Sequence, residues 1–445
     1  MLSLAIPVVL AELGWIAMGV VDTMMVGRVS VEAIGAVSVG RVLFFTVTVF
    51  GMGLLLGLDT LVSTSYGAGR LEDCRRSLFH GVYLSFLIAV PLTTLMFVAV
   101  PFLDLLGIDP DVLRLTGPYL SALAWTALPL LLYTTLRRYL QGLNRVRPVM
   151  IALISANLVN VAGNWILIFG NLGAPALGAE GAAWSTCIAS WYMALFLVGA
   201  TLLHGREEKR GSLRAAMRPE PARIRRLLGL GLPAAIQLLL EVGVFGTVTA
   251  LAGRLAPSSL AAHQIALTAA SVTFMVPLGI SSAGAVRVGQ ALGRRDAAGA
   301  GRAGWTALFL SACFMFAAAL AFLLVPRPIV RVFSADPRVI TAGVALLAVA
   351  ALFQLFDGLQ VVATGALRGS GDTRTPLVWS LVGYWILGLP VGYYLCFVRD
   401  HGVVGLWVGL LIGLFVTGMT LVTVWSRTAR RFDARLAATP SRGLP

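Results

Sequence analysis

Five acidic residues stand inside long apolar runs of this sequence, where an ionised carboxylate is costly. They are Glu12, Asp22, Asp59, Glu241 and Asp357. On membrane-insertion scales an acid at the bilayer centre costs about 2.5–3.5 kcal/mol. Each of these side chains therefore requires a cation, a proton or a hydrogen-bonding partner.

Asp22 is expected to share one depth with three amide- or hydroxyl-bearing residues. Asp22, Asn164 and Thr186 each lie about five or six residues from the outer ends of their apolar runs. Asn160 and Asn164 are four residues apart, so they share a helix face. Carboxylate, amide and hydroxyl oxygens are hard ligands that suit Na⁺, and the same carboxylate can instead take a proton. The alternative is a hydrogen-bonded plug that only fixes helix packing.

Glu241 and Asp357 lie near the middles of two apolar runs in the second half of the chain, with no Lys or Arg at that depth. Two carboxylates in a low dielectric do not both stay ionised comfortably. We expect them to bind a cation or a proton; the alternative is an ordinary neutral buried acid. Asp59 lies nearer an inner helix end, and we expect it to have a structural role there. Glu12 is expected either to line an inward-facing cavity or to take part only in helix packing.

Other chemistries find no support in the residue pattern. The sequence contains no GxSxG, P-loop or HExxH motif, which argues against an enzyme and against direct use of ATP. The four cysteines are scattered without metal-ligand spacing, so we expect neither a disulfide framework nor a metal framework, and no cofactor. His263 is expected to be a satisfied polar residue rather than a proton relay.

The elements that must position these residues are membrane spans. Of 445 residues, 58% are hydrophobic and 12% are charged, about half the charged share of a soluble protein. A span needs about 20 apolar residues. Twelve runs qualify: 2–27, 38–64, 80–105, 116–138, 148–170, 180–203, 226–252, 260–286, 304–326, 341–366, 376–398 and 402–426.

The basic residues give these spans an orientation. When the connections after even-numbered spans and the C-terminal tail are placed on one side, that side holds 26 of the 34 Lys and Arg residues. By the positive-inside rule this side is cytoplasmic, with both termini inside. The net charge of +14 is thus a topology signal and does not indicate a nucleic-acid partner. We predict a multi-pass protein of the plasma (inner) membrane whose other partners are lipids.

The two halves of the chain repeat each other. Pro7 and Pro233 are 226 residues apart, and so are the Gly-Arg pairs that begin at Gly27 and Gly253; Gly69 is paired with Gly293 at 224. Six helices per half imply two lobes of the same topology, related by a pseudo-twofold axis along the membrane normal, as suits alternating access. The predicted fold is therefore an all-α integral membrane protein of twelve helices. Its predicted parts are an N-terminal lobe (1–205), a cytoplasmic linker (206–225), a C-terminal lobe (226–426) and a basic cytoplasmic tail (427–445).

The residues resemble the multidrug and toxic compound extrusion (MATE) family, in its NorM-like branch, along essentially the whole chain. The first half carries VDTMMVGRVSVEAIGAVSVG, GLDTLVSTSYGAGR, LQGLNRVRPVM and NWILIFGNLGAPALGAEGAAWSTCIASW. The second half carries LLGLGLPAAIQLLLEVGVFGTV, LAAHQIALTAASV, VGQALGRRDAAGA and FDGLQVVATGALRGSGDTRTP. The order and spacing of these segments are more specific than any one of them. One departure is Thr64, where the family often has glutamine.

The resemblance implies roles for the residues singled out above. Asp22, Asn160, Asn164 and Thr186 fall on the family's first-lobe cation site, a candidate for Na⁺ or H⁺. Glu241 and Asp357 fall on its second-lobe acids. The implied function is export of amphipathic, often cationic, organic compounds in exchange for Na⁺ or H⁺, by a monomer. A lipid-linked oligosaccharide flippase commonly needs a basic cleft, whereas the charges expected in mid-membrane here are acidic. A non-transporting membrane protein is the other alternative.

Overall fold

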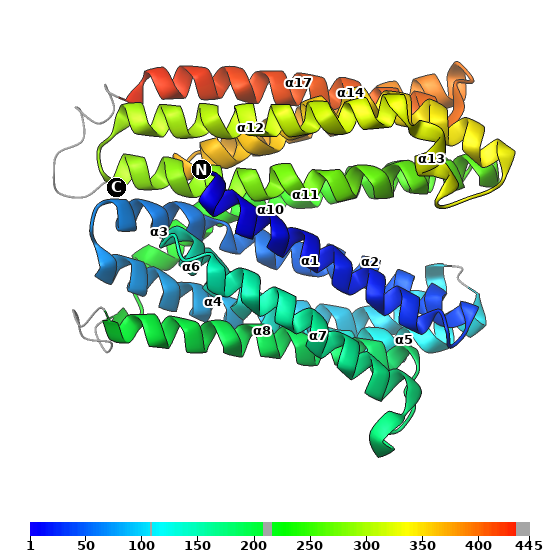
Figure 1. Ribbon diagram of the computed structural model, residues 1–445, viewed down its shortest axis with the longest axis horizontal. Helices are drawn as coiled ribbons and strands as arrows, with labels where there is room; N and C mark the ends of the chain where they lie inside the picture. Colours follow the sequence, from blue (N-terminus) through cyan, green and yellow to red (C-terminus); the bar gives the residue numbers. More distant parts are fainter. Residues whose placement is uncertain (107–108, 208–215, 433–445) are drawn as a thin grey trace. The chain divides into compact units, whose positions relative to one another are not determined.

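The computed structural model describes residues 1–106, 109–207 and 216–432, and all regular secondary structure in these ranges is helical (Figure 1). Eleven helical segments are long and apolar enough to cross a membrane, and a twelfth span is made by two helices that meet at a 44° bend. The prediction of a twelve-span, all-α membrane protein is confirmed. Residues 208–215 of the predicted linker and 433–445 of the predicted tail lie outside the described ranges.

The first six spans use nine helical segments. They are α1 (Leu2–Val26), α2 (Val31–Leu55) continued by α3 (Gly57–Gly67), α4 (Leu71–Ala99) continued by the 3₁₀ turn η1 (Val100–Leu106), the bent pair α5 (Pro110–Ala124) and α6 (Ala127–Gly142), α7 (Arg147–Phe169) and α8 (Ala179–Glu207). A short 3₁₀ turn, η2 (Asn171–Gly173), joins the last two.

The second six spans follow the same order. They are α10 (Pro221–Ala252), α11 (Pro257–Gly293), α12 (Ala297–Leu324) with the short α13 (Pro326–Arg331), α14 (Pro337–Gly369), the composite span α15 (Arg374–Ser380), η3 (Leu381–Gly388), α16 (Leu389–Tyr393) and η4 (Tyr394–Val398), and α17 (Gly402–Arg430). Several helices extend beyond the predicted apolar runs, because a helix continues into the polar interface after its apolar stretch has ended.

The span from Arg374 to Val398 departs from regular α-helix, since η3 and η4 are π-helical. This span packs closely on α17 through facing glycines. A Cβ added at Gly409 would lie 2.3 Å from the Gly392 Cα, and one at Gly413 would lie 2.3 Å from the Gly383 oxygen. Lipid gives no hydrophobic drive for helix association, so such backbone contact supplies the packing.

Contact between helices divides the described residues into two compact units. The first unit is Leu10–Tyr66 with Arg70–Ala235, and the second is Met1–Val9, Gly67–Gly69 and the residues from Ile236 onward. The division differs from the predicted lobe boundaries, because it falls inside α10 rather than in the linker. The physical reason is that the first part of α10 packs on α2, where a Cβ at Gly231 would lie 2.0 Å from the Leu54 oxygen.

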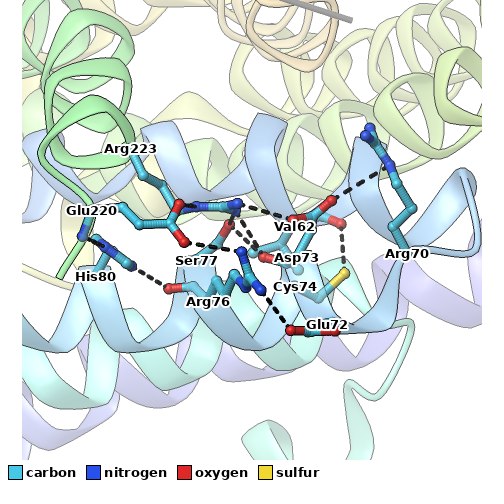
Figure 2. Close-up of polar contacts among 10 residues, drawn as sticks. All are labelled: Val62, Arg70, Glu72, Asp73, Cys74, Arg76, Ser77, His80, Glu220 and Arg223. Atoms are coloured by element: carbon cyan, nitrogen blue, oxygen red, sulfur yellow. Dashed lines mark hydrogen bonds and ion pairs between the residues drawn. The ribbon is translucent and has the colours of Figure 1, made fainter. Parts of the chain in front are cut away.

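A polar network, here called the clasp, also holds the start of α10 to α4 (Figure 2). Arg223 forms an ion pair with Asp73 at 2.9 Å and another with Glu220 at 3.2 Å. Arg76 pairs with Glu220 at 3.0 Å. The Glu220 amide donates to His80 Nε2 at 2.8 Å. These contacts explain why Arg223 and its neighbours belong to the first unit.

His80 uses both ring nitrogens within this clasp. Because Nε2 accepts the Glu220 amide, the ring proton belongs on Nδ1, which donates to the Arg76 carbonyl at 2.6 Å. The Tyr83 hydroxyl adds a hydrogen bond to the Met217 carbonyl at 2.6 Å. Residues 217–223 are therefore tied to α4 at several points along its length.

Local structure repeats between the two halves of the chain. Asp109 and Asp336, 227 apart, each accept a hydrogen bond from the amide two residues later and cap the helix that follows. The Arg338 amide holds the pKa of Asp336 below its usual range. Left-handed backbone occurs at Gly69 (φ 73°) and at Arg295 (φ 61°), which are 226 apart. The predicted pairing of Gly69 with Gly293 was therefore two residues out of register.

Candidate cation and substrate sites

The four residues predicted to share a depth in the first unit do come together. Asn164 Nδ2 donates to Asp22 Oδ1 at 2.7 Å, and Thr186 Oγ1 donates to Asp22 Oδ2 at 3.0 Å. Asn164 Nδ2 also lies 3.2 Å from Asn160 Oδ1. Asp22 is 4% exposed and both asparagines are fully buried. Helices α1, α7 and α8 each contribute to this cluster, so its geometry depends on how these three helices pack.

The carboxylate of the cluster accepts hydrogen bonds only from neutral donors, and the Arg41 guanidinium acts on it electrostatically from its bond to the Gly19 carbonyl. Ser185 borders the cluster, and its hydroxyl donates to the Asn160 carbonyl at 2.8 Å. Asn164 Oδ1 is buried and has no hydrogen-bond partner. Buried polar atoms almost always have one, so this oxygen is available to a ligand. Rotation of the Asn164 amide would bring it toward Asp22 in place of Nδ2.

The donor set fits a small hard cation or a proton. Asp22, Asn160, Asn164 and Thr186 together offer carboxylate, amide and hydroxyl oxygens, which Na⁺ prefers. Protonated Asp22 would instead donate to one of the same oxygens. The cluster has a single carboxylate, and the described residues contain no group of three His, Cys, Asp or Glu placed to hold a metal.

Glu241 in the second unit is held by a cradle of neutral donors. Its Oε1 accepts hydrogen bonds from Gln237 Nε2 at 3.0 Å, Gln360 Nε2 at 2.8 Å and Ser380 Oγ at 3.3 Å. Trp385 Nε1 donates to the Leu240 carbonyl at 3.0 Å and fixes the composite span beside α10. All three side-chain donors use one carboxylate oxygen, which leaves the other oxygen to a ligand.

Asp357 lies one turn before Gln360 on α14, so it faces the same side as the residue that binds Glu241. It is 8% exposed and makes no hydrogen bond or ion pair with any described residue. It interacts electrostatically with Glu241. Neither acid forms an ion pair within the described ranges, although Arg368 acts on Glu241 through longer-range electrostatics, and two acids on facing helices attract positive charge.

The family of the chain follows from comparison with known proteins. The MatE family model matches the chain twice, at residues 7–166 and 233–394. The chain belongs to the MATE family. The two matches begin 226 residues apart, which is the offset of the internal repeat.

Relatives of known designation cover nearly the whole MATE chain. A "Probable multidrug resistance protein NorM" of Mesorhizobium japonicum is 37% identical over 96% of this chain and 93% of the relative. One of Rhodopseudomonas palustris is 38% identical over 98% and 93%. The "Multidrug resistance protein NorM" of Aliivibrio fischeri is 34% identical over 97% and 96%.

Solved MATE structures share the fold. The eukaryotic MATE transporter AtDTX14 superposes with a TM-score of 0.85 at 22% identity, covering 98% of both chains. An outward-facing multidrug resistance MATE transporter gives a TM-score of 0.88 at 18% identity, covering 97% of this chain and 96% of that one. The chain is thus a multi-pass membrane transporter of an ion-coupled family and not an enzyme, as predicted.

Of the five acids that stand within apolar runs, the remaining two, Glu12 and Asp59, form ion pairs that the sequence did not predict. Arg137 Nη2 binds Glu12 Oε1, and Arg138 Nη1 lies 3.3 Å from Asp59 Oδ2. The structural role expected of Asp59 stays a prediction, and its ion pair with Arg138 fits it. The expectation that the charges within the spans are all acidic is wrong, because Arg137 and Arg138 of α6 are largely buried. Arg368 of α14 is also buried and acts electrostatically on Glu241.

His263 is a satisfied polar residue, as predicted. Trp407 Nε1 donates to its Nδ1 at 3.0 Å, and its Nε2 lies 2.9 Å from the Thr249 hydroxyl. Both ring nitrogens are therefore used within the helix bundle. The ring is built into packing and has no nitrogen left for a relay.

Sequence reasoning missed the glutamines of the Glu241 cradle, although spacing contained a signal for them. Gln237 is four residues before Glu241, and Gln360 is three residues after Asp357. Both positions share a helix face with the acid. Ser380 had no such signal, because its position depends on the π-helical span that brings it to α10.

Proposed function

We propose that this MATE chain exports amphipathic, often cationic, organic compounds in exchange for Na⁺ or H⁺. The observation that carries the proposal is the buried Asp22 carboxylate with its neutral oxygen donors on Asn160, Asn164 and Thr186. A carboxylate that forms no ion pair with a basic side chain binds a small cation or a proton reversibly. The designations of the NorM relatives support a multidrug cargo.

The coupling follows from competition between charge states. Burial penalises a bare carboxylate unless it is paired and hydrogen-bonded. An ion that arrives from outside neutralises Asp22 and shifts the conformational equilibrium, which it does only through different affinities for the two conformations. Cargo is released as the equilibrium shifts, and loss of the ion to the cytoplasm resets the transporter.

Glu241 and Asp357 are proposed to hold the positive charge of the cargo or a coupling ion in the second unit. The donors Gln237, Gln360 and Ser380 orient the Glu241 carboxylate without neutralising it. Aromatic rings lie close by, with Phe245 packed against Tyr384 at 6.4 Å. Acidic groups beside aromatic faces suit an amphipathic organic cation.

The protein is proposed to act as a monomer in the inner membrane, with both termini cytoplasmic. The excess of basic residues on one side supports this orientation. Lipids are its only other proposed partners.

The test uses purified protein in liposomes loaded with a fluorescent cationic dye. A Na⁺ gradient and a pH gradient are imposed separately, each at zero gradient of the other ion. Dye efflux driven by one gradient identifies the coupling ion. Absence of efflux under both gradients, together with movement of lipid-linked oligosaccharide between leaflets, would replace the antiport proposal with a flippase.

A further inference from the structure

A row of polar groups extends from the Asp22 cluster toward the inner end of α1, within the first unit. Asn157, Asn160 and Asn164 are spaced three and four residues apart, so they share one face of α7. Asn157 Nδ2 donates to the Gly14 carbonyl of α1 at 3.1 Å. The asparagine face of α7 therefore leads from Asp22 to a point two residues from Glu12.

Helix α1 approaches α7 closely at this point because Gly14 has no side chain. A Cβ at Gly14 would lie 2.9 Å from the Leu153 Cδ2 and 3.6 Å from the Asn157 Nδ2. The backbone carbonyl of α1 is thereby presented to the asparagine face. Polar atoms thus replace apolar packing between the two helices.

At the inner end of the row, Glu12 meets a second polar face, on α6. Tyr133, Arg137 and Gln141 are spaced four residues apart and share that face. Arg137 binds Glu12 directly. The Tyr133 hydroxyl is within electrostatic reach of both Glu12 and Arg137.

Several atoms of this α6 face are buried and lack a hydrogen-bond partner. They are Arg137 Nε, Gln141 Oε1 and Gln141 Nε2, whereas the Tyr133 hydroxyl interacts with the Arg137 side chain. Tyr133 is 2% exposed and Gln141 is 1% exposed. Buried polar atoms nearly always bond to protein or to water. Donors and acceptors gathered beside a carboxylate suit internal water and a hydrated cation.

Building on the proposed antiport, we propose that Glu12, Arg137, Tyr133 and Gln141 form a low-affinity station through which the coupling ion passes from Asp22 to the cytoplasm. The ion is a hydrated Na⁺ or a proton carried by water. In the proton case, Asp22 gives its proton to water, Glu12 takes it from water, and Glu12 returns it to cytoplasmic water. No other group gains or loses a proton.

Arg137 gives the station its low affinity. Asp22 has only neutral hydrogen-bonding partners; the Arg41 guanidinium donates to the Gly19 carbonyl and acts on Asp22 through electrostatics without a hydrogen bond or ion pair to it. At Glu12 the arriving ion must compete with the Arg137 guanidinium for the carboxylate. A permanent cation within contact distance weakens binding of a second cation or proton by about tenfold or more. A release site requires this weak binding, since tight binding would hold the ion.

The neighbouring ion pair of Arg138 with Asp59 provides a matched control. It has the same residue chemistry and comparable burial, and its arginine is adjacent to Arg137. Its carboxylate lies on α3 and not on α1, so it does not belong to the α1–α7 row, although Asp59 acts on Arg137 through longer-range electrostatics. Neutralising this pair tests what the loss of a buried ion pair does by itself.

The experiment measures ion dependence separately on the two faces of the membrane, in proteoliposomes of known orientation. Dye efflux gives the external ion concentration for half-maximal rate and the cytoplasmic concentration for half-inhibition. The neutral double variant Glu12→Gln/Arg137→Gln is expected to raise the cytoplasmic value about tenfold and leave the external value unchanged. Arg137→Gln alone is expected to lower the cytoplasmic value by a similar factor, because Glu12 then binds the ion without competition.

The uncharged part of the station has its own test. Tyr133→Phe removes only the hydroxyl, so it is expected to slow dye efflux with the external half-maximal concentration unchanged, whether or not the charge variants fold. The control Asp59→Asn/Arg138→Gln should leave the ratio of cytoplasmic to external values at the wild-type level. Equal changes on both faces in the double variant, the same altered ratio in the control, or a Tyr133→Phe efflux rate equal to wild type would each overturn the station.

Asp22→Asn separates this inference from the proposed function. If Asp22→Asn leaves gradient-driven efflux intact, the proposed antiport itself fails. If Asp22→Asn abolishes efflux while the Glu12 and Tyr133 variants behave as wild type, only the exit route fails.

Discussion

At the scale of single residues, Asp22 concentrates the function proposed for this chain. Its two carboxylate oxygens are bound by different helices, one through Asn164 and the other through Thr186. A change of its charge is therefore felt by both α7 and α8. Glu180 is also bound by a neutral side chain, but that donor, Trp184, lies on the same helix.

We predict that Asp22→Asn abolishes gradient-driven dye efflux and leaves the protein folded. The amide keeps the volume of the carboxylate, its oxygen can accept one of the two hydrogen bonds and its nitrogen can donate to the Thr186 hydroxyl. It carries no charge for Na⁺ or a proton to neutralise. Efflux in proteoliposomes measures the first effect, and size-exclusion profile with thermal melting in detergent measures the second. Asp104→Asn, at an exposed acid of the same unit, is the control and should transport as wild type. Efflux at the wild-type rate in Asp22→Asn would contradict this prediction.

A second residue-scale prediction concerns cargo charge. Glu241→Gln is expected to reduce export of a cationic dye more than export of a neutral substrate of similar size, because the carboxylate oxygen left free by Gln237, Gln360 and Ser380 is lost. Asp357→Asn should act in the same direction. Competition between the two substrates in one preparation measures the difference. An equal loss for both substrates would point to packing and not to charge recognition.

The Asp22 cluster could be predicted from the sequence because helical rise fixes depth and helical period fixes a face. Asn160 and Asn164 needed only their spacing, and Thr186 only its distance from a span end. The Glu12 and Asp59 partners could not be predicted in the same way. Arg137 and Arg138 follow an apolar run, where basic residues usually mark the interface, and only the packing of α6 against α1 and α3 shows that they turn inward. The available signal was that Glu12 and Asp59 had no partner in the sequence pattern, while two adjacent arginines, Arg137 and Arg138, ended another apolar run.

At the scale of elements, the clasp joins α10 to α4 before α10 enters the second unit (Figure 2). Its arginines lie in the first turns of both helices, where Arg223 and Arg76 share Glu220. The apolar pattern predicted both helices, but it did not predict that a linker segment would fold onto one of them. Such docking depends on side chains far apart in the sequence.

We predict that Arg223→Gln lowers the unfolding free energy by about 1–2 kcal/mol, because it removes partly buried, charge-assisted hydrogen bonds to Asp73 and Glu220. Thermal melting in detergent measures the loss. High salt should reduce the difference from wild type, since salt screens these ion pairs. Arg225→Gln, at an exposed neighbour on the same helix, is the control. If Arg225→Gln melts as low as Arg223→Gln, the clasp does not stabilise the protein.

At the scale of the whole molecule, the duplication extends to individual close contacts. Gly53 meets Ala235 in the first unit, and Gly279 meets Val9 in the second. Gly53 and Gly279 are 226 residues apart in the sequence, and so are Val9 and Ala235. Each half thus keeps a glycine on its second helix, where the backbone of another helix packs closely against it. The sequence alone showed the repeat through prolines and turn glycines, while these contacting pairs required the packed helices.

Equivalent positions should respond equally to the same change. A Cβ at Gly53 would lie 2.4 Å from the Ala235 Cα, and a Cβ at Gly279 would lie 2.9 Å from the Val9 nitrogen. Overpacking of this kind typically costs about 1–3 kcal/mol, so Gly53→Ala and Gly279→Ala should both lower the melting temperature, by similar amounts. Gly246→Ala is the control, because nothing lies within 4 Å of its Cβ; alanine there should be neutral or stabilising, by up to about 1 kcal/mol. A large loss at one of the two equivalent positions and none at the other would show that the repeat preserves the helix pattern but not the contacts on which each half depends.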